Sequence, residues 1–408
     1  MNSPAPPTAY LRRGTPEYGR TARALFAAGF VCFAMIYVVQ GVLPDVSRDF
    51  GVSPAAASLT VSLTTLPLAV AVIVVASYSE GYGRRRLLVG ALFLGSVLTV
   101  ASAASPAYPA LLGFRVLTGC ALAGLPAVAM AYVGEEVDRA SLGAAMGLYI
   151  SATGLGGMTG RWVGGLVAGA LSWRWALVVI GLVGLVGSLW VAMRLPPSRH
   201  FVPRPARLGV QLRELRVPLR DRVLLVLYAC GFALMGGNVA YYNYLQYRLH
   251  APPFSLPSTA VAMVFLLYLC GTVSANWMGR RTDRHTRRSV LLLGLIVMLA
   301  GVVASVVESL PVVLLATAVL TFGFFGAHAV ASGWVNAQAT SRRAQASALY
   351  LLFYYIGSSV IGFVAGLFLG GYGWYGLAGM LAVLVAAATV LAARLPSTTR
   401  GAVRSDAT

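Results

Sequence analysis

The stretch "LYISATGLGGMTGRWVGGLVAGALSW", residues 148–173, occurs twice in this chain in recognisable form. Its second copy is "LYLLFYYIGSSVIGFVAGLFLGGYGW", residues 349–374, about half of the chain further on. Both copies begin with Leu-Tyr, both end with Trp, and Gly156 corresponds to Gly357. Each is apolar and long enough to cross a bilayer, which takes about 20 residues in a helix. A duplicated spanning segment predicts two related helical bundles.

The composition extends this prediction to the whole chain. Of 408 residues, 58% are hydrophobic and 11% are charged, whereas a soluble domain has about 25% charged residues. The apolar runs are much longer than the strands of a membrane barrel and do not alternate with polar residues. We therefore predict an all-α membrane protein with 12 transmembrane helices in two pseudo-symmetric six-helix bundles. The expected spans are 23–43, 55–78, 87–104, 109–134, 141–170, 173–195, 222–248, 258–278, 289–307, 312–336, 344–369 and 374–394.

The longest polar stretch divides the chain between the two bundles. It is rich in Pro and Arg, as expected of a linker at the membrane surface. The predicted parts are a cytoplasmic N-terminal tail (1–22), an N-terminal six-helix bundle (23–195), a cytoplasmic linker (196–221), a C-terminal six-helix bundle (222–395) and a cytoplasmic C-terminal tail (396–408).

The arginines predict the orientation. All 31 basic residues are arginine, and placing both termini in the cytoplasm puts 26 of them on the cytoplasmic side and three outside. This bias follows the positive-inside rule. The net charge of +19 is then a feature of topology, and we expect no nucleic-acid partner. The four cysteines have no metal-like spacing, so we expect neither a metal site nor a cofactor.

Several local motifs resemble those of the major facilitator superfamily, over essentially the whole chain. The loop after the second span of each half matches the pattern G-x-x-x-D-R-x-G-R-R, well in the second half and less well in the first. The fourth span has R-x-x-x-G, and the fifth has the glycines of the family's antiporter signature, with Arg161 at the position of its proline. The residues are Glu80, Gly81, Arg84 and Arg85; Gly279, Asp283, Arg284, Arg287 and Arg288; Arg115 and Gly119; and Gly156, Gly160, Arg161 and Gly164.

Within that family the sequence is similar to YnfM-like, arabinose-efflux-type exporters of bacterial inner membranes. The resemblance implies a secondary active transporter that exports a drug, sugar or metabolite by alternating access and proton-coupled antiport. Because Arg161 replaces the antiporter proline, a facilitator, a uniporter or an importer of a polar or anionic metabolite stays open. We expect a multi-pass inner-membrane monomer that contacts lipid, protons and its solute.

The loop motifs imply a conformational latch. In the resembled fold, the loop acid lies near a helix N-terminus of the other half when the inside face is closed, where the helix dipole favours a negative charge. An acid that ends the fourth span is expected to pair with the loop arginine. The residues assigned to the latch are Glu80, Arg84, Glu135, Glu136, Asp283 and Arg287.

Two arginines lie deep in predicted spans. Arg115 and Arg161 fall about 10–14 Å below the outer surface, from the rise of 1.5 Å per residue. Because a lipid-facing arginine is costly, we expect both to face a polar cavity. Gly156, Gly160 and Gly164 then form a separate face that packs closely on a neighbouring helix.

The same cavity needs groups that bind solute and protons. Arginine does not release its proton, so Asp45 near Arg115 and His328, which titrates near neutral pH, are the candidates for proton coupling. Asn and Tyr side chains near mid-span are suited to hydrogen bonding and stacking with a polar or aromatic solute. The predicted substrate-binding residues are Tyr37, Gln40, Arg115, Arg161, Asn238, Tyr242, Asn243, His328 and Tyr354.

Two other classes of function compete with transport. An intramembrane enzyme needs a nucleophile and a base within the bilayer, and His328 with Ser332 is the one such pair, with no third group evident. A receptor or sensor would usually carry an added soluble domain. We therefore predict that the protein is not an enzyme and has no catalytic residues.

Overall fold

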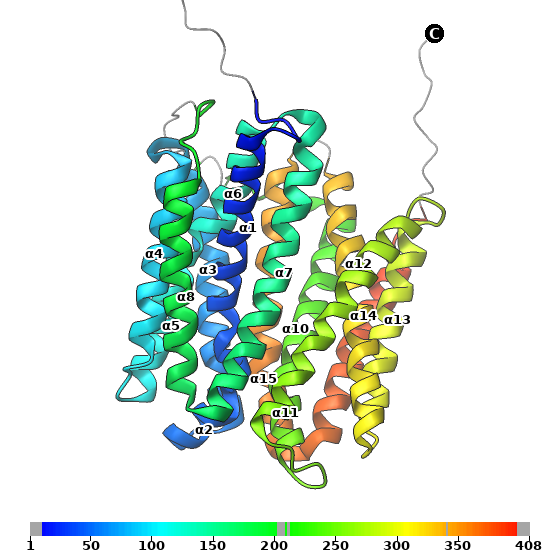
Figure 1. The fold of residues 1–408 in the computed structure, drawn as a ribbon. Coiled ribbons are helices and arrows are strands. Elements are labelled where there is room, and N and C mark those ends of the chain that lie inside the picture. The colour runs from blue at the N-terminus through cyan, green and yellow to red at the C-terminus, as the bar shows by residue number, and fades with distance from the viewer. Residues whose placement is uncertain (1–9, 202–208, 210–212, 340–341, 398–408) are drawn as a thin grey trace, which may run out of the picture. The chain divides into compact units, whose positions relative to one another are not determined.

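The computed structural model describes residues 10–201, 209, 213–339 and 342–397. Parts of the predicted tails (1–22 and 396–408) and linker (196–221) lie outside the described residues, as does the side chain of Glu80. The described backbone consists of helices, turns and irregular segments, with one isolated bridge between Leu11 and Val137 (Figure 1). The protein is all-α over this part, as predicted.

The described chain contains twelve helical spans. Ten stretches are long and apolar enough to cross a membrane. One of them, α15 (Arg343–Ala393), consists of two helices joined at Gly373, which has a φ of 63°. To these is added α7 (Arg139–Ala170), whose 32 residues are long enough to span a membrane. The predicted number of spans is thereby confirmed.

The chain forms two compact units, described here separately. Unit 1 comprises Met1–Gln211 and Ser255–Phe265. Its first span is α1, continued by a short 3₁₀ segment and α2, and its fourth is α5 with α6. Its elements are α1 (Pro16–Tyr37), η1 (Val38–Val42), α2 (Leu43–Phe50), α3 (Pro54–Tyr82), α4 (Arg84–Ser102), α5 (Tyr108–Leu122), α6 (Gly124–Glu136), α7, α8 (Trp173–Arg194) and α11 (Ser258–Met263).

Unit 2 comprises Leu212–Phe254 and Leu266–Thr408. Within it α10 packs along α15, and α13 packs along α14. The 3₁₀ segment η3 (Val264–Tyr268) leads from α11 into α12 and contains the point where the chain passes from unit 1 to unit 2. Its elements are η2 (Pro218–Arg220), α10 (Arg222–His250), α12 (Leu269–Arg281), α13 (Arg287–Ala304), α14 (Leu310–Gln338) and α15.

Polar capping residues explain where several spans begin. The hydroxyl of Thr15 accepts a hydrogen bond from the backbone N–H of Tyr18, and Pro16 is the first helical residue of α1. Ser53 caps α3 and Asp221 caps α10 in the same way. Such residues satisfy N–H groups that the first helical turn leaves unpaired. The first helix therefore begins at Pro16, earlier than the predicted start of the bundle.

The sequence repeat reappears as a repeat of contacts within each unit. A Cβ atom built on Gly156 would collide with the backbone carbonyl of Phe30 on α1, and one on Gly357 would collide with that of Phe232 on α10. The first and fifth spans of each unit therefore approach at backbone distance. Small residues permit this approach in membranes, where van der Waals packing drives helix association.

A second repeated contact ties the third span to the end of the sixth. Arg85 donates from Nε to the backbone carbonyl of Leu195 at 2.7 Å, and Arg288 donates from Nη1 to that of Leu395 at 3.1 Å. Each arginine caps carbonyls that the end of a helix leaves without intrahelical donors. The second loop arginine of each half is therefore a structural cap within its own unit.

Candidate functional site

Three of the predicted substrate residues meet in unit 1. The guanidinium of Arg161 on α7 donates from Nε to Oε1 of Gln40 at 2.5 Å. Its carbon Cζ lies 3.8 Å from the centre of the Tyr37 ring. It also donates to the carbonyl of Gly157, one turn earlier in its own helix, at 2.7 Å. All three side chains are buried. We call Tyr37, Gln40 and Arg161 the arginine cluster.

Glycines bring the two elements of the arginine cluster together. On α7, Gly160 faces the backbone of Ala34 and Gly164 faces Val38. On the other side of the contact, a Cβ on Gly41 in η1 would collide with the carbonyl oxygen of Arg161. The glycine face packs against the first span, and Arg161 follows Gly160 about 100° further round the helix. Its side chain therefore projects beside the packing seam and reaches Gln40.

Arg115 has different surroundings. Its side chain is fully buried, and Nη2 donates to the backbone carbonyls of Ile36 at 2.7 Å and Met35 at 3.3 Å. Nε donates to the carbonyl of Thr60 at 3.4 Å. Where α1 changes to the 3₁₀ segment η1, the hydrogen-bond spacing changes and leaves carbonyls available. Arg115 thus holds the turn that presents Tyr37.

The acid that we expected beside Arg115 lies elsewhere. Asp45 on α2 forms an ion pair with Arg48 at 3.2 Å, and the Arg48 side chain is 72% exposed. The next acid, Asp49, accepts hydrogen bonds from Arg174 at 2.9 Å and from the indole of Trp173 at 3.0 Å. These pairings belong to the α2 end of the first span. Asp45 as a proton carrier stays a prediction.

In unit 2, α10 carries three predicted residues that are all buried. Asn238 donates from Nδ2 to the hydroxyl of Tyr268 at 3.0 Å, while its Oδ1 has no hydrogen-bond partner in the described part. The hydroxyl of Tyr242 shares a hydrogen bond with Thr321 at 2.7 Å. Asn243 is fully buried in the same helix. An amide oxygen without a partner is unusual in a protein interior and marks Asn238 as available to a ligand.

His328 on α14 lies in a group of rings with α15. Its Nδ1 is 2.9 Å from the hydroxyl of Tyr350, and its ring centre is 4.6 Å from that of Tyr354. The ring of Phe324 is stacked with both His328 and Tyr354, at 6.1 and 6.4 Å between ring centres. We call His328, Tyr350 and Tyr354 the histidine cluster. The cluster contains a ring nitrogen and hydroxyl that can exchange a proton.

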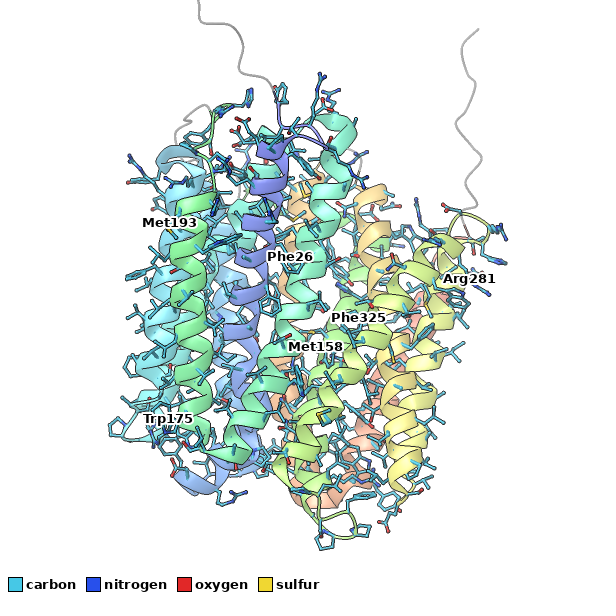
Figure 2. All side chains as sticks on the ribbon, in the orientation of Figure 1. Phe26, Met158, Trp175, Met193, Arg281 and Phe325 are labelled. Atoms are coloured by element: carbon cyan, nitrogen blue, oxygen red, sulfur yellow. The ribbon has the colours of Figure 1, made fainter. Side chains whose placement is uncertain are left out.

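Sequence reasoning missed the aromatic residues that connect the buried polar residues of α10 with the histidine cluster. Tyr268 in η3 contacts the ring of Tyr242 at 4.6 Å between centres, and Phe325 on α14 contacts Tyr268 at 5.6 Å (Figure 2 labels Phe325). Phe325 in turn contacts Phe324 at 4.9 Å. The run "FGFF" was visible in the sequence, but an aromatic run in a span is typical of any membrane helix.

The loop residues assigned to a latch differ in the contacts that they make. Arg84 pairs with Glu135 on α6, with Nη2 2.6 Å from Oε1 and Nε 3.2 Å from both carboxylate oxygens. In unit 2, Asp283 is exposed in the turn after α12. Arg287 forms no hydrogen bond or ion pair with another residue of the described part. Gln338, the last residue of α14, donates from Nε2 to Oδ2 of Asp221 at 3.0 Å.

Glu136 belongs to a contact that the sequence did not indicate. Its Oε1 accepts hydrogen bonds from the backbone N–H groups of Arg199 at 2.7 Å and His200 at 2.9 Å. The ring of His200 stacks on Tyr10 with centres 4.2 Å apart, and Leu11 forms the backbone bridge to the residue after Glu136. The contacts around Glu136 therefore tie the segment at Tyr10 and Leu11, and the start of the linker, to the end of α6.

The described residues contain no group of three or more His, Cys, Asp or Glu side chains placed to hold a metal ion. Chemically, the arginine cluster offers a cation, an amide and a phenol, a set that can bind carboxylates, phosphates or hydroxyl groups. The histidine cluster offers an imidazole nitrogen beside a tyrosine hydroxyl, a pair that can share a hydrogen bond with each other or with a ligand.

Comparison with known proteins identifies relatives along nearly the whole chain. A family model described as Major Facilitator Superfamily matches residues 25–282 and 238–407. The uncharacterized MFS-type transporter YybF of Bacillus subtilis is 44% identical over 386 residues, which are 95% of this chain and 96% of that protein. The inner membrane transport protein YnfM of Escherichia coli is 38% identical over 389 residues, with 95% and 93% covered.

A solved structure shows the same fold at low sequence identity. It is the bacterial homologue of the human lysosomal transporter Spinster, in an inward-facing and occupied conformation. It aligns with a TM-score of 0.76 and 17% identity, and the match covers 93% of this chain and 96% of that chain.

Proposed function

Because this chain belongs to the major facilitator superfamily of multi-pass secondary transporters, we propose that it exports a small organic solute by alternating access in exchange for protons. The membrane is the bacterial inner membrane, for which the relative YnfM is named. The solute is a drug, sugar or metabolite that carries an acidic group or several hydroxyls.

The observation that carries this proposal is the arginine cluster. A buried arginine in a membrane span is costly and usually functional. Arg161 is held in a defined orientation by the amide of Gln40 and the ring of Tyr37, and a planar guanidinium can bind a carboxylate or phosphate through two parallel hydrogen bonds. We therefore assign Tyr37, Gln40 and Arg161 to the solute, and Arg115 to positioning the turn that carries Tyr37.

In unit 2 we assign Asn238 and Tyr354 to solute contacts, with Tyr242 and Asn243 supporting them on α10. The unpartnered Oδ1 of Asn238 would accept a hydrogen bond from a hydroxyl or an amine. Tyr354 is partly exposed and presents a ring to a solute. We assign proton coupling to His328, whose Nδ1 contacts Tyr350, and keep Asp45 as its competitor.

We also propose that the loop residues bias the direction in which the transporter faces. The supporting contact is the ion pair of Arg84 and Glu135, with Glu80, Glu136, Asp283 and Arg287 as further members of the latch. The arginine bias supports a cytoplasmic position for both termini. A second candidate function is facilitated transport or import without protons, which the replacement of the antiporter proline by Arg161 favours.

The first experiment identifies the solute and tests the arginine cluster. A thermal-shift screen of the purified protein against charged and neutral metabolites and drugs selects ligands, because a ligand that binds the folded state raises its melting temperature. Arg161→Met should abolish the shift for an acidic or hydroxyl-rich hit. Arg139→Met, a matched change at an exposed position of the same helix, should leave it intact. Equal affinity of wild type and Arg161→Met for every hit would remove the cluster from the binding site.

The second experiment tests proton coupling. Everted vesicles that carry the selected solute are followed with a pH-sensitive dye during solute uptake. His328→Gln and Tyr350→Phe should abolish solute-driven proton movement. Tyr149→Phe is the matched control, because Tyr149 occupies the position in unit 1 that Tyr350 occupies in unit 2 and its hydroxyl has no partner in the described part. Loss of coupling in Asp45→Asn alone would transfer the proton role to Asp45, and no coupling in wild type would favour the facilitator.

A further inference from the structure

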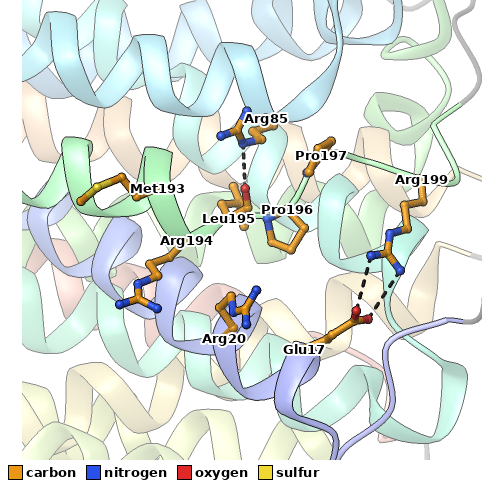
Figure 3. A pocket seen from close by; sticks show the side chains of 9 residues that line it. All are labelled: Glu17, Arg20, Arg85, Met193, Arg194, Leu195, Pro196, Pro197 and Arg199. Atoms are coloured by element: carbon orange, nitrogen blue, oxygen red, sulfur yellow. Dashed lines mark hydrogen bonds and ion pairs between the residues drawn. The ribbon is translucent and has the colours of Figure 1, made fainter.

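A basic cavity lies in unit 1 where α1 begins and α8 ends. Its volume is about 310 Å³. Figure 3 shows the guanidinium groups of Arg20, Arg85, Arg194 and Arg199 around it, together with the carboxylate of Glu17. No residue of the arginine cluster or the histidine cluster lines it. The cavity is therefore separate from the groups assigned to transport.

The charges in this cavity are mostly uncompensated by the protein. Glu17 lies 3.5 Å from Arg199, and both side chains are largely exposed. Arg85 is fixed by backbone carbonyls at the end of α8. Arg20 and Arg194 form no hydrogen bond or ion pair with another residue in the described part of the chain. The cavity thus combines one carboxylate with four guanidiniums, which suits a ligand with one or two negative charges.

An exposed apolar strip leads along α8 to this cavity. Leu182, Val186, Leu189 and Met193 are 50%, 70%, 61% and 67% exposed. Their spacing of three and four residues places them on one face of the helix. Met193 belongs to both features, since it ends the strip and is one of the residues that line the cavity (Figure 3). A ligand that fills both features must have a long apolar part and an anionic end.

A smaller cavity of about 110 Å³ adjoins the first and shares Arg20 and Arg194 with it. Arg23 and Trp190 complete its lining. Tryptophan is enriched where a span meets the polar headgroups of a membrane. This level of α8 is therefore suited to the boundary between acyl chains and headgroups.

We propose that this end of unit 1 binds an anionic phospholipid, with the phosphate in the arginine cavity and an acyl chain along the exposed strip of α8. Guanidinium groups bind phosphate through paired, charge-assisted hydrogen bonds. Basic pockets between spans bind anionic headgroups in this manner. A soluble phosphate would use the cavity but would leave the strip empty, and the strip therefore favours a lipid.

The test is a native mass spectrometry titration of the purified full-length protein with phosphatidylglycerol and with phosphatidylcholine of the same acyl chains. Wild type should prefer phosphatidylglycerol. Arg20→Gln with Arg194→Gln should weaken its binding about 30-fold, because each surface arginine contributes about five-fold. The matched control removes two charges from exposed arginines of unit 1 outside the cavity, by Arg86→Gln with Arg139→Gln, and should change binding less than about three-fold.

Three results would overturn the proposal. An equal loss in the control pair would show a diffuse field rather than a site. Binding of inorganic phosphate or glycerol phosphate as tight as that of the lipid would show a site for a soluble ligand. Unchanged affinity after Val186→Gln with Leu189→Gln would show that no acyl chain lies on the strip. The variant Arg20→Lys with Arg194→Lys keeps both positive charges. If it binds the lipid like wild type, the weaker binding of the glutamine variant results from lost charge and not from misfolding.

Discussion

Replacing Gly160 by alanine tests the claim that backbone contact between α1 and α7 positions the arginine cluster. A Cβ on Gly160 would lie 2.6 Å from the Cα and 2.8 Å from the carbonyl carbon of Ala34. Ordinary van der Waals contact begins at 3.4 Å. The carbonyl oxygen of Ala34 would lie nearer still, so the two helices must move apart by at least about 0.8 Å, the difference between 3.4 and 2.6 Å. Backbone atoms on both sides leave no flexible side chain that could yield.

The expected cost follows from two opposing terms. Overpacking of a close contact costs about 1–3 kcal/mol, and a gap of 0.5–1 Å along the rest of the seam forfeits a quarter to a half of each dispersion contact. Alanine is the better helix former by about 1 kcal/mol. The packing term dominates, so we expect Gly160→Ala to destabilise the protein by about 1–2 kcal/mol. The matched control is Gly154→Ala in the same helix, where an added Cβ meets nothing within 4 Å.

The assay is the apparent melting temperature of the purified protein in one detergent. Gly154→Ala should melt at or slightly above wild type, and Gly160→Ala should melt several degrees below it, at about 2–4 °C per kcal/mol. Gly160→Ala should also weaken binding of the solute, because the shift separates Arg161 from Gln40. If the two variants melted at the same temperature, the close approach of α1 and α7 would be refuted.

Three further outcomes follow from contacts within single units. Arg84→Gln and Glu135→Gln should each lower the melting temperature, and the double variant should lower it by less than the sum, because both singles break one ion pair; additive losses would show that the pair is uncoupled. Arg115→Leu should lower it because the buried carbonyls of Met35 and Ile36 lose their donor, at a cost of about 1–3 kcal/mol for each carbonyl left without a partner; a melting temperature equal to wild type would contradict the contact of Arg115 with the carbonyls of α1. In unit 2, Gly357→Ala should destabilise while Gly370→Ala, which meets nothing within 4 Å, should not; equal effects would argue against the repeated contact between first and fifth spans.

The spans and the repeat could be read from the sequence because both are local properties. A span is recognised from about 20 consecutive apolar residues, and the repeat from matching letters such as Gly156 and Gly357. The structure adds the reason for that match, since each glycine lies against the carbonyl of a phenylalanine on the first span of its unit. Because spans are recognised locally, the expected number of twelve helices agrees with the structure.

The candidate site was predicted only in part. Tyr37, Gln40 and Arg161 were expected to share a cavity, and in the structure Arg161 contacts both Gln40 and Tyr37. Arg115 lies at similar depth in the sequence, but its partners are backbone carbonyls at the end of α1, and these carbonyls are available because η1 is a 3₁₀ segment. A change of helix type within an apolar run leaves no clear mark in the sequence.

The sequence by itself determined the class of the protein, the number of its spans, its two-fold repeat and the residues too polar to face lipid. These features depend on the free energy of transferring side chains from water into the bilayer and on the pattern of residues along the chain. Only the tertiary structure decided the partner of each polar residue: Arg161 with Gln40, His328 with Tyr350, and the four arginines that line the cavity at the end of α8. The physical reason is that these partners are set by the rotation and separation of packed helices, which depend on close contacts between residues far apart in the chain.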